Sequence, residues 1–209
     1  MIVLLSDPQV AAVPVRESGE ELVRLNPSFG PACAFVRRGL AERLTRAQLA
    51  LPLGIALRVV EGHRSVADQR AIIAAYSAEV CAAHPGISPE DLHRLTSRFV
   101  SPVDVAPHVA GAAVDLTLVD ACGDELDLGT PIDATPEQSG GACYFAASGI
   151  SADARAHRDL LARVLTGAGL VNYPTEWWHW SFGDRYWALT TGADCAPYGP
   201  VPVEAEDAA

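Results

Sequence analysis

The chain has 209 residues and a formal net charge of −11, and 49% of its residues are hydrophobic. This length suits one domain with a sizeable core. The acidic balance excludes a surface built to bind nucleic acid or an anionic membrane, so a small-molecule partner is expected. Every one of the 15 basic Lys or Arg positions is an arginine, which excludes a Schiff-base lysine and a P-loop lysine.

Cysteine usage and the first residues indicate a cellular compartment. The five cysteines are odd in number, scattered and nowhere in a C-x-x-C arrangement, which is typical of reduced thiols in a cytoplasmic protein. The apolar start at Met1 to Leu5 lacks a basic region and is ended by Asp7, so we expect no signal peptide. No window of the sequence has the length and apolarity of a membrane span.

Hydrophobic periodicity and capping residues predict the elements along the chain. The first half should contain an extended N-terminal arm (1–31), an amphipathic helix (32–50), a strand (55–60), a helix capped by Ser65 and ending near 83, and a helix opened by Ser88 and ending near 99. The second half should contain a strand (113–119), a long loop, a helix (152–166) capped by Ser151, a strand (170–173), and a strand and turn (180–189). We expect a loose C-terminal tail over 192–209. Short strands and separate helices favour an α+β fold, with helices packed around a small, mainly antiparallel sheet.

Two stretches combine residues that could hold a metal ion. His108 and Asp115 lie seven residues apart, which is roughly 23 Å of extended chain, so the chain must turn before both can reach one ion. Gly111 supplies a permissive backbone for that turn. With His179 they offer two imidazoles and one carboxylate to zinc and leave a fourth position for water. Taken alone, the first two residues are also typical of a loop histidine and a capping aspartate.

Glu176 lies beside two tryptophans and three residues before His179. A carboxylate among aromatic rings is poorly hydrated, so it should be paired or have a raised pKa, which suits a general base near neutral pH. The alternative is an aromatic strand anchored by a single salt bridge.

Several motifs in order resemble one known family, the D-alanyl-D-alanine dipeptidases of the vancomycin-resistance type, which are zinc peptidases related to D,D-carboxypeptidases. The resemblance rests on His-x-x-Gly-x-Ala-x-Asp-Leu-Thr-Leu from His108 to Leu118, Glu-Trp-Trp-His from 176 to 179, Gly-Ile-Ser at 149–151 with the helix that follows, and Glu-Gly-His-Arg at 61–64. Agreement of several ordered motifs is a stronger signal than any one of them.

We expect a single zinc peptidase domain over residues 1–209, and the resemblance, which covers about residues 55–190, implies one zinc per chain. Its ligands would be His108, Asp115 and His179, and Glu176 would be the catalytic base. Arg64 falls where the family keeps an arginine that stabilises the oxyanion, and a guanidinium can donate two parallel hydrogen bonds to such a centre. Asp133, in the long loop, matches an aspartate that holds the amino terminus of the substrate. The implied reaction is hydrolysis of D-alanyl-D-alanine or a closely related small dipeptide.

The sequence departs from the family where substrate is held. Ala106 replaces a serine two residues before the first histidine, Ser65 replaces a proline, and the first tyrosine is Tyr76, so the family's N-terminal tyrosine is missing. Two alternatives therefore stay open, which are a related zinc amidase or peptidase for another small amide, and a non-catalytic zinc-containing binding module.

Overall fold

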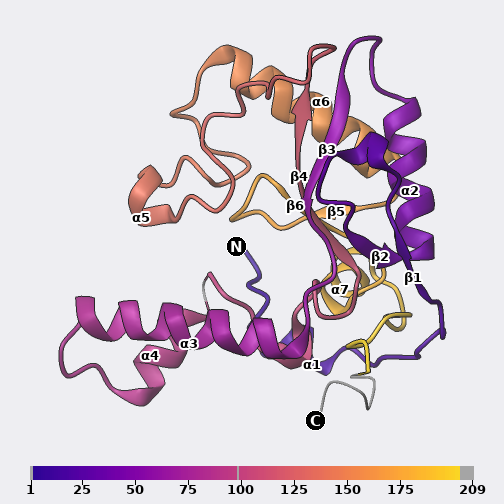
Figure 1. Cartoon of the computed structure of the whole chain (residues 1–209). Coiled ribbons are helices and arrows are strands. Elements are labelled where there is room, and N and C mark those ends of the chain that lie inside the picture. Colours follow the sequence, from indigo (N-terminus) through magenta and orange to yellow (C-terminus); the bar gives the residue numbers. More distant parts are fainter. Residues whose placement is uncertain (1, 98, 203–209) are drawn as a thin grey trace. The chain divides into compact units, whose positions relative to one another are not determined.

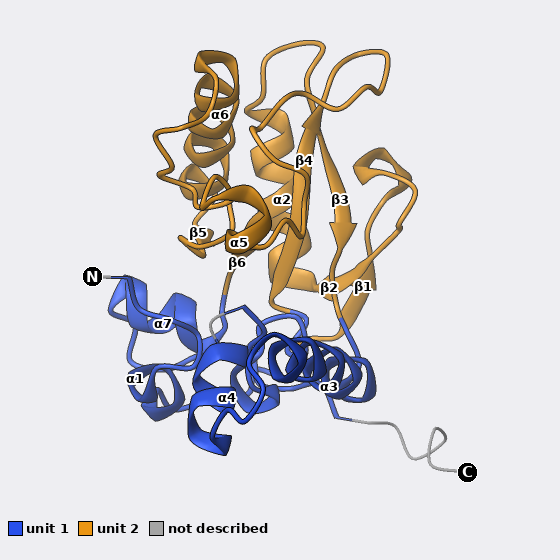
Figure 2. Cartoon of the chain, turned by 90° about the vertical axis from the view of Figure 1, so that its left-hand side faces the viewer, with its two compact units in different colours: residues 1–18, 64–111, 183–209 blue, residues 19–63, 112–182 orange. Residues whose placement is uncertain are grey.

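The structure is a computed structural model that describes residues 2–97 and 99–202. Its elements follow one another along the chain as labelled in Figure 1. They divide into two compact units (Figure 2), of which unit 1 comprises residues 1–18, 64–111 and 183–209, and unit 2 comprises residues 19–63 and 112–182. Across the part of the chain that the structure describes, no helix has the length and apolar character needed to cross a membrane.

Unit 1 is helical. Its elements are α1 (Pro8–Ala12), α3 (Val66–Ala83), α4 (Pro89–Thr96), the 3-10 helix η2 (Val103–Val105) and α7 (Arg185–Thr191). The side chains of Ser65 and Ser88 accept hydrogen bonds from the N–H groups of Asp68 and Asp91, which satisfies a free donor at the start of α3 and of α4. The predicted caps of both helices are thus confirmed, although α4 ends three residues earlier than expected.

Unit 2 is built on a four-stranded antiparallel sheet in the order β3-β4-β6-β5. The strands are β3 (Ala56–Glu61), β4 (Ala113–Val119), β5 (Val171–Asn172) and β6 (His179–Ser181), and a second, two-stranded sheet consists of β1 (Leu22–Arg24) and β2 (Phe35–Arg37). The helices are α2 (Arg38–Leu49), the short α5 (Pro136–Ser139) and α6 (Ala152–Gly167), with the 3-10 helix η1 (Pro27–Phe29). The α+β fold with a small antiparallel sheet is therefore confirmed.

The central strand β4 is buried along its whole length, because β3 and β6 pair with its two edges and apolar side chains cover its faces. Helices α2 and α6 pack on each other, and α6 also contacts β5. The fully buried core residues of this unit include Leu40, Leu44, Leu116, Leu118, Leu161 and Leu165. A strand held on both sides is a rigid support for the side chains that it carries.

Two expected elements are corrected by the structure. Residues 35–37, expected to be helical, form β2 because their backbone pairs with Leu22–Arg24, and α2 begins only at Arg38. Part of the strand and turn expected over 180–189 is the helix α7, since the carboxylate of Asp184 accepts from the N–H groups of Tyr186 and Trp187 and caps it.

The two terminal segments contain ordered backbone. The N-terminal segment 1–31 includes α1, β1 and η1 in addition to extended chain. In the segment expected to be a loose tail, Ala196 forms a parallel bridge with Val15, and both Ala196 and Tyr198 are buried. Residues 203–209 of that segment lie outside the described residues.

Candidate metal centre

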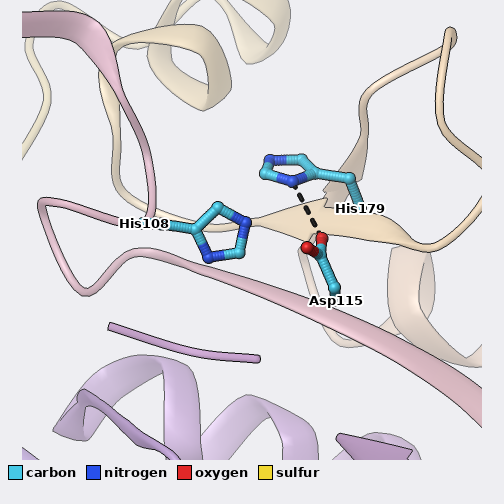
Figure 3. Close-up of side chains that lie close together, drawn as sticks. All are labelled: His108, Asp115 and His179. Carbon is cyan, nitrogen blue, oxygen red and sulfur yellow. Dashed lines mark hydrogen bonds and ion pairs between the residues drawn. The ribbon is translucent and has the colours of Figure 1, made fainter. Parts of the chain in front are cut away.

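His108, Asp115 and His179 form a buried group that could hold a metal ion (Figure 3). One ligand atom from each side chain lies within 4.8 Å of the other two. The three residues are 6%, 4% and 4% exposed. Burial of two imidazoles and a carboxylate in one place is costly unless they are paired or bind an ion, so the arrangement favours a metal site.

The register of the sheet places two of the three side chains together. Asp115 in β4 lies directly opposite His179, the first residue of β6. Side chains directly opposite each other in an antiparallel pair lie on the same face, about 5 Å apart at Cβ. The distance between Asp115 Oδ1 and His179 Nδ1 is 3.1 Å.

His108 comes from the turn that leads into β4. Gly111 has the left-handed φ of 64°, and its N–H group donates to the carbonyl oxygen of His108 at 3.0 Å. The chain folds back on itself there, as the sequence predicted from the distance between His108 and Asp115. A residue with a Cβ atom would be strained at that φ, which explains the glycine.

The donor set fits zinc. Zinc in proteins takes imidazole nitrogen and carboxylate oxygen at about 2.0–2.2 Å in tetrahedral geometry, which puts neighbouring ligand atoms roughly 3.3 Å apart. The 3.1 Å between Asp115 and His179 is close to that separation. Three protein ligands are the number found in catalytic zinc sites, whereas structural sites use four.

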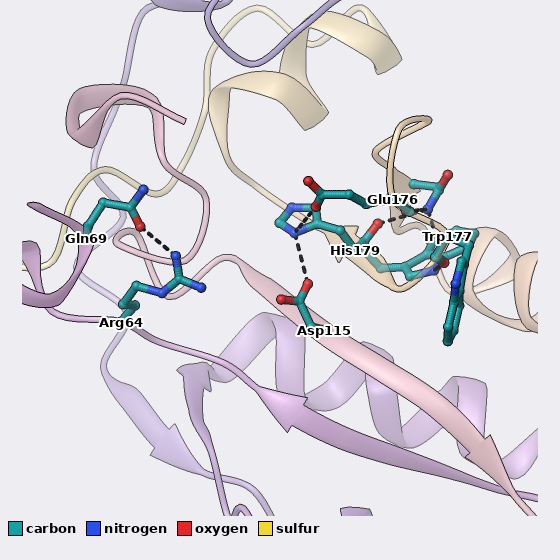
Figure 4. Close-up of polar contacts among 8 residues, drawn as sticks. Arg64, Gln69, Asp115, Glu176, Trp177 and His179 are labelled. Carbon is teal, nitrogen blue, oxygen red and sulfur yellow. Dashed lines mark hydrogen bonds and ion pairs between the residues drawn. The ribbon is translucent and has the colours of Figure 1, made fainter. Parts of the chain in front are cut away.

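Glu176 lies in the loop between β5 and β6, next to the ligand group. Its Oε2 atom is 3.9 Å from His179 Nδ1, and its side chain is 13% exposed (Figure 4). Trp177 and Trp178, which follow it, are buried and meet edge to face with ring centroids 5.5 Å apart. Two buried tryptophans thus follow Glu176 in the chain, and the Trp177 ring faces Thr130 and Arg158.

Arg64 follows β3 and precedes α3. Its backbone N–H donates to the carbonyl oxygen of His108 at 3.2 Å, and its Nη1 donates to Gln69 Oε1 at 2.8 Å (Figure 4). Gln69 is 1% exposed, and its Nε2 in turn donates to the carbonyl oxygen of Ser101. Gln69 was not predicted as a site residue, because no local pattern in the sequence indicates that its amide meets Arg64 and Ser101.

Asp133 is exposed and lies in the loop between β4 and α5. Its φ of 64° is left-handed, a conformation that aspartate tolerates better than most residues. It does not belong to the His108, Asp115 and His179 group. Its role in holding an amino terminus remains a prediction.

Arg158 in α6 binds the chain on both sides of the short helix α5. It is fully buried, and its guanidinium donates to the carbonyl oxygens of Leu128, Tyr144, Phe145 and Ala142. The central carbon of its guanidinium, Cζ, also lies 5.6 Å from the centre of the Trp177 ring. Burial lowers the pKa of Arg158 to about 10, which leaves it charged at neutral pH. The buried, charged guanidinium of Arg158 thus donates charge-assisted hydrogen bonds to these carbonyl oxygens.

The buried His-Asp-His group defines a candidate metal centre, and comparison with known proteins identifies the family. The Peptidase M15 profile, described as D-ala-D-ala dipeptidase, matches residues 55–193. The chain therefore belongs to this family of metallopeptidases.

Two relatives agree with that assignment. A D-alanyl-D-alanine dipeptidase of Synechocystis sp. is 26% identical over 85% of this chain and 87% of its own length. A D-alanyl-D-alanine dipeptidase of Escherichia coli is 38% identical over 34% of this chain and 35% of its own length.

Two solved structures share the fold. A mutant of the vancomycin resistance D,D-pentapeptidase VanY from a VanB-type resistance cassette, in complex with Zn(II), is similar with a TM-score of 0.51 and 16% identity, over 87% of this chain and 86% of that one. VanYB in complex with D-alanine-D-alanine has a TM-score of 0.52 and 18% identity, over 94% of this chain and 93% of that one.

Proposed function

We propose that this chain hydrolyses the peptide bond of D-alanyl-D-alanine, or of a closely related small dipeptide, with zinc held by His108, Asp115 and His179. The observation that carries the proposal is the buried His-Asp-His group with the Glu176 carboxylate 3.9 Å from one of its imidazoles. Two relatives named D-alanyl-D-alanine dipeptidase, and the complex of VanYB with D-alanine-D-alanine, support the choice of substrate.

Zinc bound at this group would polarise the scissile carbonyl and make water acidic enough to attack near neutral pH. In the proposed reaction Glu176 takes a proton from the attacking water. The same carboxyl group then gives that proton to the leaving amine nitrogen, so the base is restored after each turnover. The Glu176 side chain is 13% exposed, so little of its surface is open to bulk water.

Arg64 is proposed to stabilise the negative charge that develops on the carbonyl oxygen. Its hydrogen bond to Gln69 uses Nη1 and fixes the direction of the guanidinium plane. A guanidinium is planar and always charged, so a preorganised one favours the transition state over the neutral amide of the ground state. Asp133 is proposed to pair with the free amino terminus of the dipeptide.

The groups required for hydrolysis distinguish an enzyme from a binding module. Binding alone needs neither a base nor an oxyanion partner, whereas Glu176 is placed beside a ligand and Arg64 is held by a buried glutamine. A related zinc amidase or peptidase for another small amide is the second candidate. It is favoured by Ala106, which is 3% exposed and offers no side-chain hydroxyl to a substrate.

The proposal is tested with zinc-loaded protein and a panel of D,D-, L,D- and L,L-dipeptides, with release of free amino acid as the readout. D-alanyl-D-alanine should be cleaved fastest, and Glu176→Ala should serve as the blank. Cleavage of a different small amide at a higher kcat/KM would favour the second candidate. Wild-type protein that binds zinc but cleaves no member of the panel above the blank would contradict the proposed substrate class.

A further inference from the structure

The loop between β5 and β6 brings together the residues of the proposed chemistry. Residues 173–178 connect Asn172, the last residue of β5, to His179, the first residue of β6. Glu176 lies within this loop. The relative positions of the proposed base and of one proposed ligand therefore depend on the shape of six residues of irregular chain.

The side chain of Asn172 binds the backbone of this loop. The Nδ2 atom of Asn172 donates to the carbonyl oxygen of Glu176 at 2.9 Å and to that of His179 at 3.0 Å, and it lies 3.5 Å from that of Trp177. Carbonyl oxygens only accept hydrogen bonds, so the amide nitrogen, with its two hydrogens, is the part of the side chain that belongs there. The two amide hydrogens are directed at the backbone carbonyl oxygens of Glu176, the proposed base, and His179, a proposed ligand.

The amide of Asn172 adds to the backbone hydrogen bonds of this loop. His179 donates its N–H to the Glu176 carbonyl at 3.3 Å, and Tyr173 donates to the His179 carbonyl at 3.0 Å. Each of these two carbonyl oxygens thus accepts one hydrogen bond from the backbone and one from Asn172. A single amide ties both ends of the Glu176 to His179 segment to the end of β5.

We propose that Asn172 is a positioning residue that sets where the Glu176 carboxylate lies relative to the His179 imidazole. It acts through the backbone of both residues. The inference rests on the proposed function, because it assigns Asn172 a part in that reaction. Groups that orient metal ligands and bases from behind are expected to affect metal affinity and turnover by about 10–100-fold.

Two variants and a matched control test the proposal. Asn172→Ala removes the amide, and Asn172→Asp keeps its size but presents oxygen atoms to carbonyl oxygens. The control is Gln48→Ala. Gln48 is also a half-buried amide in unit 2, and its Oε1 accepts from the backbone N–H of Leu57 at 2.8 Å, which joins α2 to β3. Gln48→Ala therefore removes a comparable side-chain hydrogen bond outside the β5–β6 loop.

Three measurements are made on the full chain, which are zinc affinity by competition with a chromophoric chelator, steady-state kinetics (kcat and KM) on D-alanyl-D-alanine, and amide hydrogen exchange of residues 173–179 without zinc. Both Asn172 variants should lower zinc affinity and kcat by about 10–100-fold with little change in KM. Amide hydrogen exchange of residues 173–179 should be faster in both Asn172 variants than in wild type. Gln48→Ala should lower thermal stability and leave zinc affinity, kcat, KM and loop exchange near wild type.

The outcomes separate this inference from the proposed function. Wild-type protein that cleaves no dipeptide overturns the proposed function, while zinc affinity and hydrogen exchange still decide the role of Asn172. Wild-type zinc affinity and loop exchange in Asn172→Ala would overturn the inference. So would a Gln48→Ala variant that loses as much kcat as the Asn172 variants, since the effect would then be one of stability. If Asn172→Asp fails to fold, Asn172→Ala decides.

Discussion

Asp115 Oδ1 lies 3.1 Å from His179 Nδ1, and the two residues face each other across neighbouring strands. Asp115 lies on the central strand of the sheet, which is buried along its length. Because strand register positions this pair, its spacing does not depend on the conformation of a loop. Ligands on paired strands are held more precisely than ligands on flexible segments.

The first prediction concerns metal content. Purified protein reconstituted with zinc should retain about one ion per chain, because three ligands with one open position define a single catalytic-type site. His179→Ala should lose most of it, since two ligands remain. Elemental analysis after removal of loosely bound metal is the measurement.

A matched control for the metal prediction is His93→Ala. His93 is exposed on α4 and lies outside the ligand group, so this variant should keep its zinc. Wild-type protein that remains metal-free after reconstitution, or a His179→Ala variant with full occupancy, would contradict the assignment of the site.

The second prediction separates the base from the ligands. Glu176→Gln should keep zinc and thermal stability near wild type, because the amide has the size of the carboxylate and Glu176 is not a member of the ligand group. Hydrolysis should fall by about 10²–10⁴-fold, the usual contribution of a positioned general base. Turnover at the wild-type rate with zinc bound would show that another group accepts the proton.

Much of the fold could be predicted from the sequence because its signals are local. The strand 113–119 follows from a run of apolar and β-branched residues, and the helices after Ser65 and Ser151 follow from caps that act within three residues. The three members of the ligand group could be found because their motifs are short and each fixes a spacing.

The supporting residues could not be predicted in the same way. Asn172, Gln69 and Arg158 act through hydrogen bonds to backbone carbonyl oxygens or to another side chain, and no local pattern states which carbonyl will lie nearby after folding. β2 was misassigned for a related reason, since its pairing with β1 overrides the helical periodicity of residues 32–50.

The third prediction concerns alkaline stability. Burial, and then the carboxylate of Asp184, raises the pKa of Tyr186 from 10.0 to about 12. Between these values the unfolded chain has lost the phenol proton and the folded chain keeps it. The contribution of Tyr186 to the free energy of unfolding should therefore be fully present below pH 10.0, and it should fall by about 1.4 kcal/mol per pH unit between pH 10.0 and about 12.

Tyr186→Phe is the control for that pH dependence. The difference in unfolding free energy between wild type and Tyr186→Phe isolates this group, because other titrating residues contribute equally to both proteins. Urea unfolding at several pH values from 9 to 11 measures it. A difference that does not change with pH would mean that Tyr186 ionises in the folded protein at its ordinary pKa.

The last prediction concerns Arg64, whose Nη1 is held by the buried Gln69. If its guanidinium meets the oxyanion only as the tetrahedral centre forms, Arg64→Ala should lower kcat and kcat/KM by similar factors, with KM little changed. Loss of one such donor costs about 10²–10³ in rate. Arg64→Lys should restore only part of this, because one ammonium cannot reproduce the planar fork. Steady-state kinetics on the fastest dipeptide of the panel decides the matter. A raised KM with unchanged kcat would instead place Arg64 on the carboxylate of the substrate, which would make it a recognition residue.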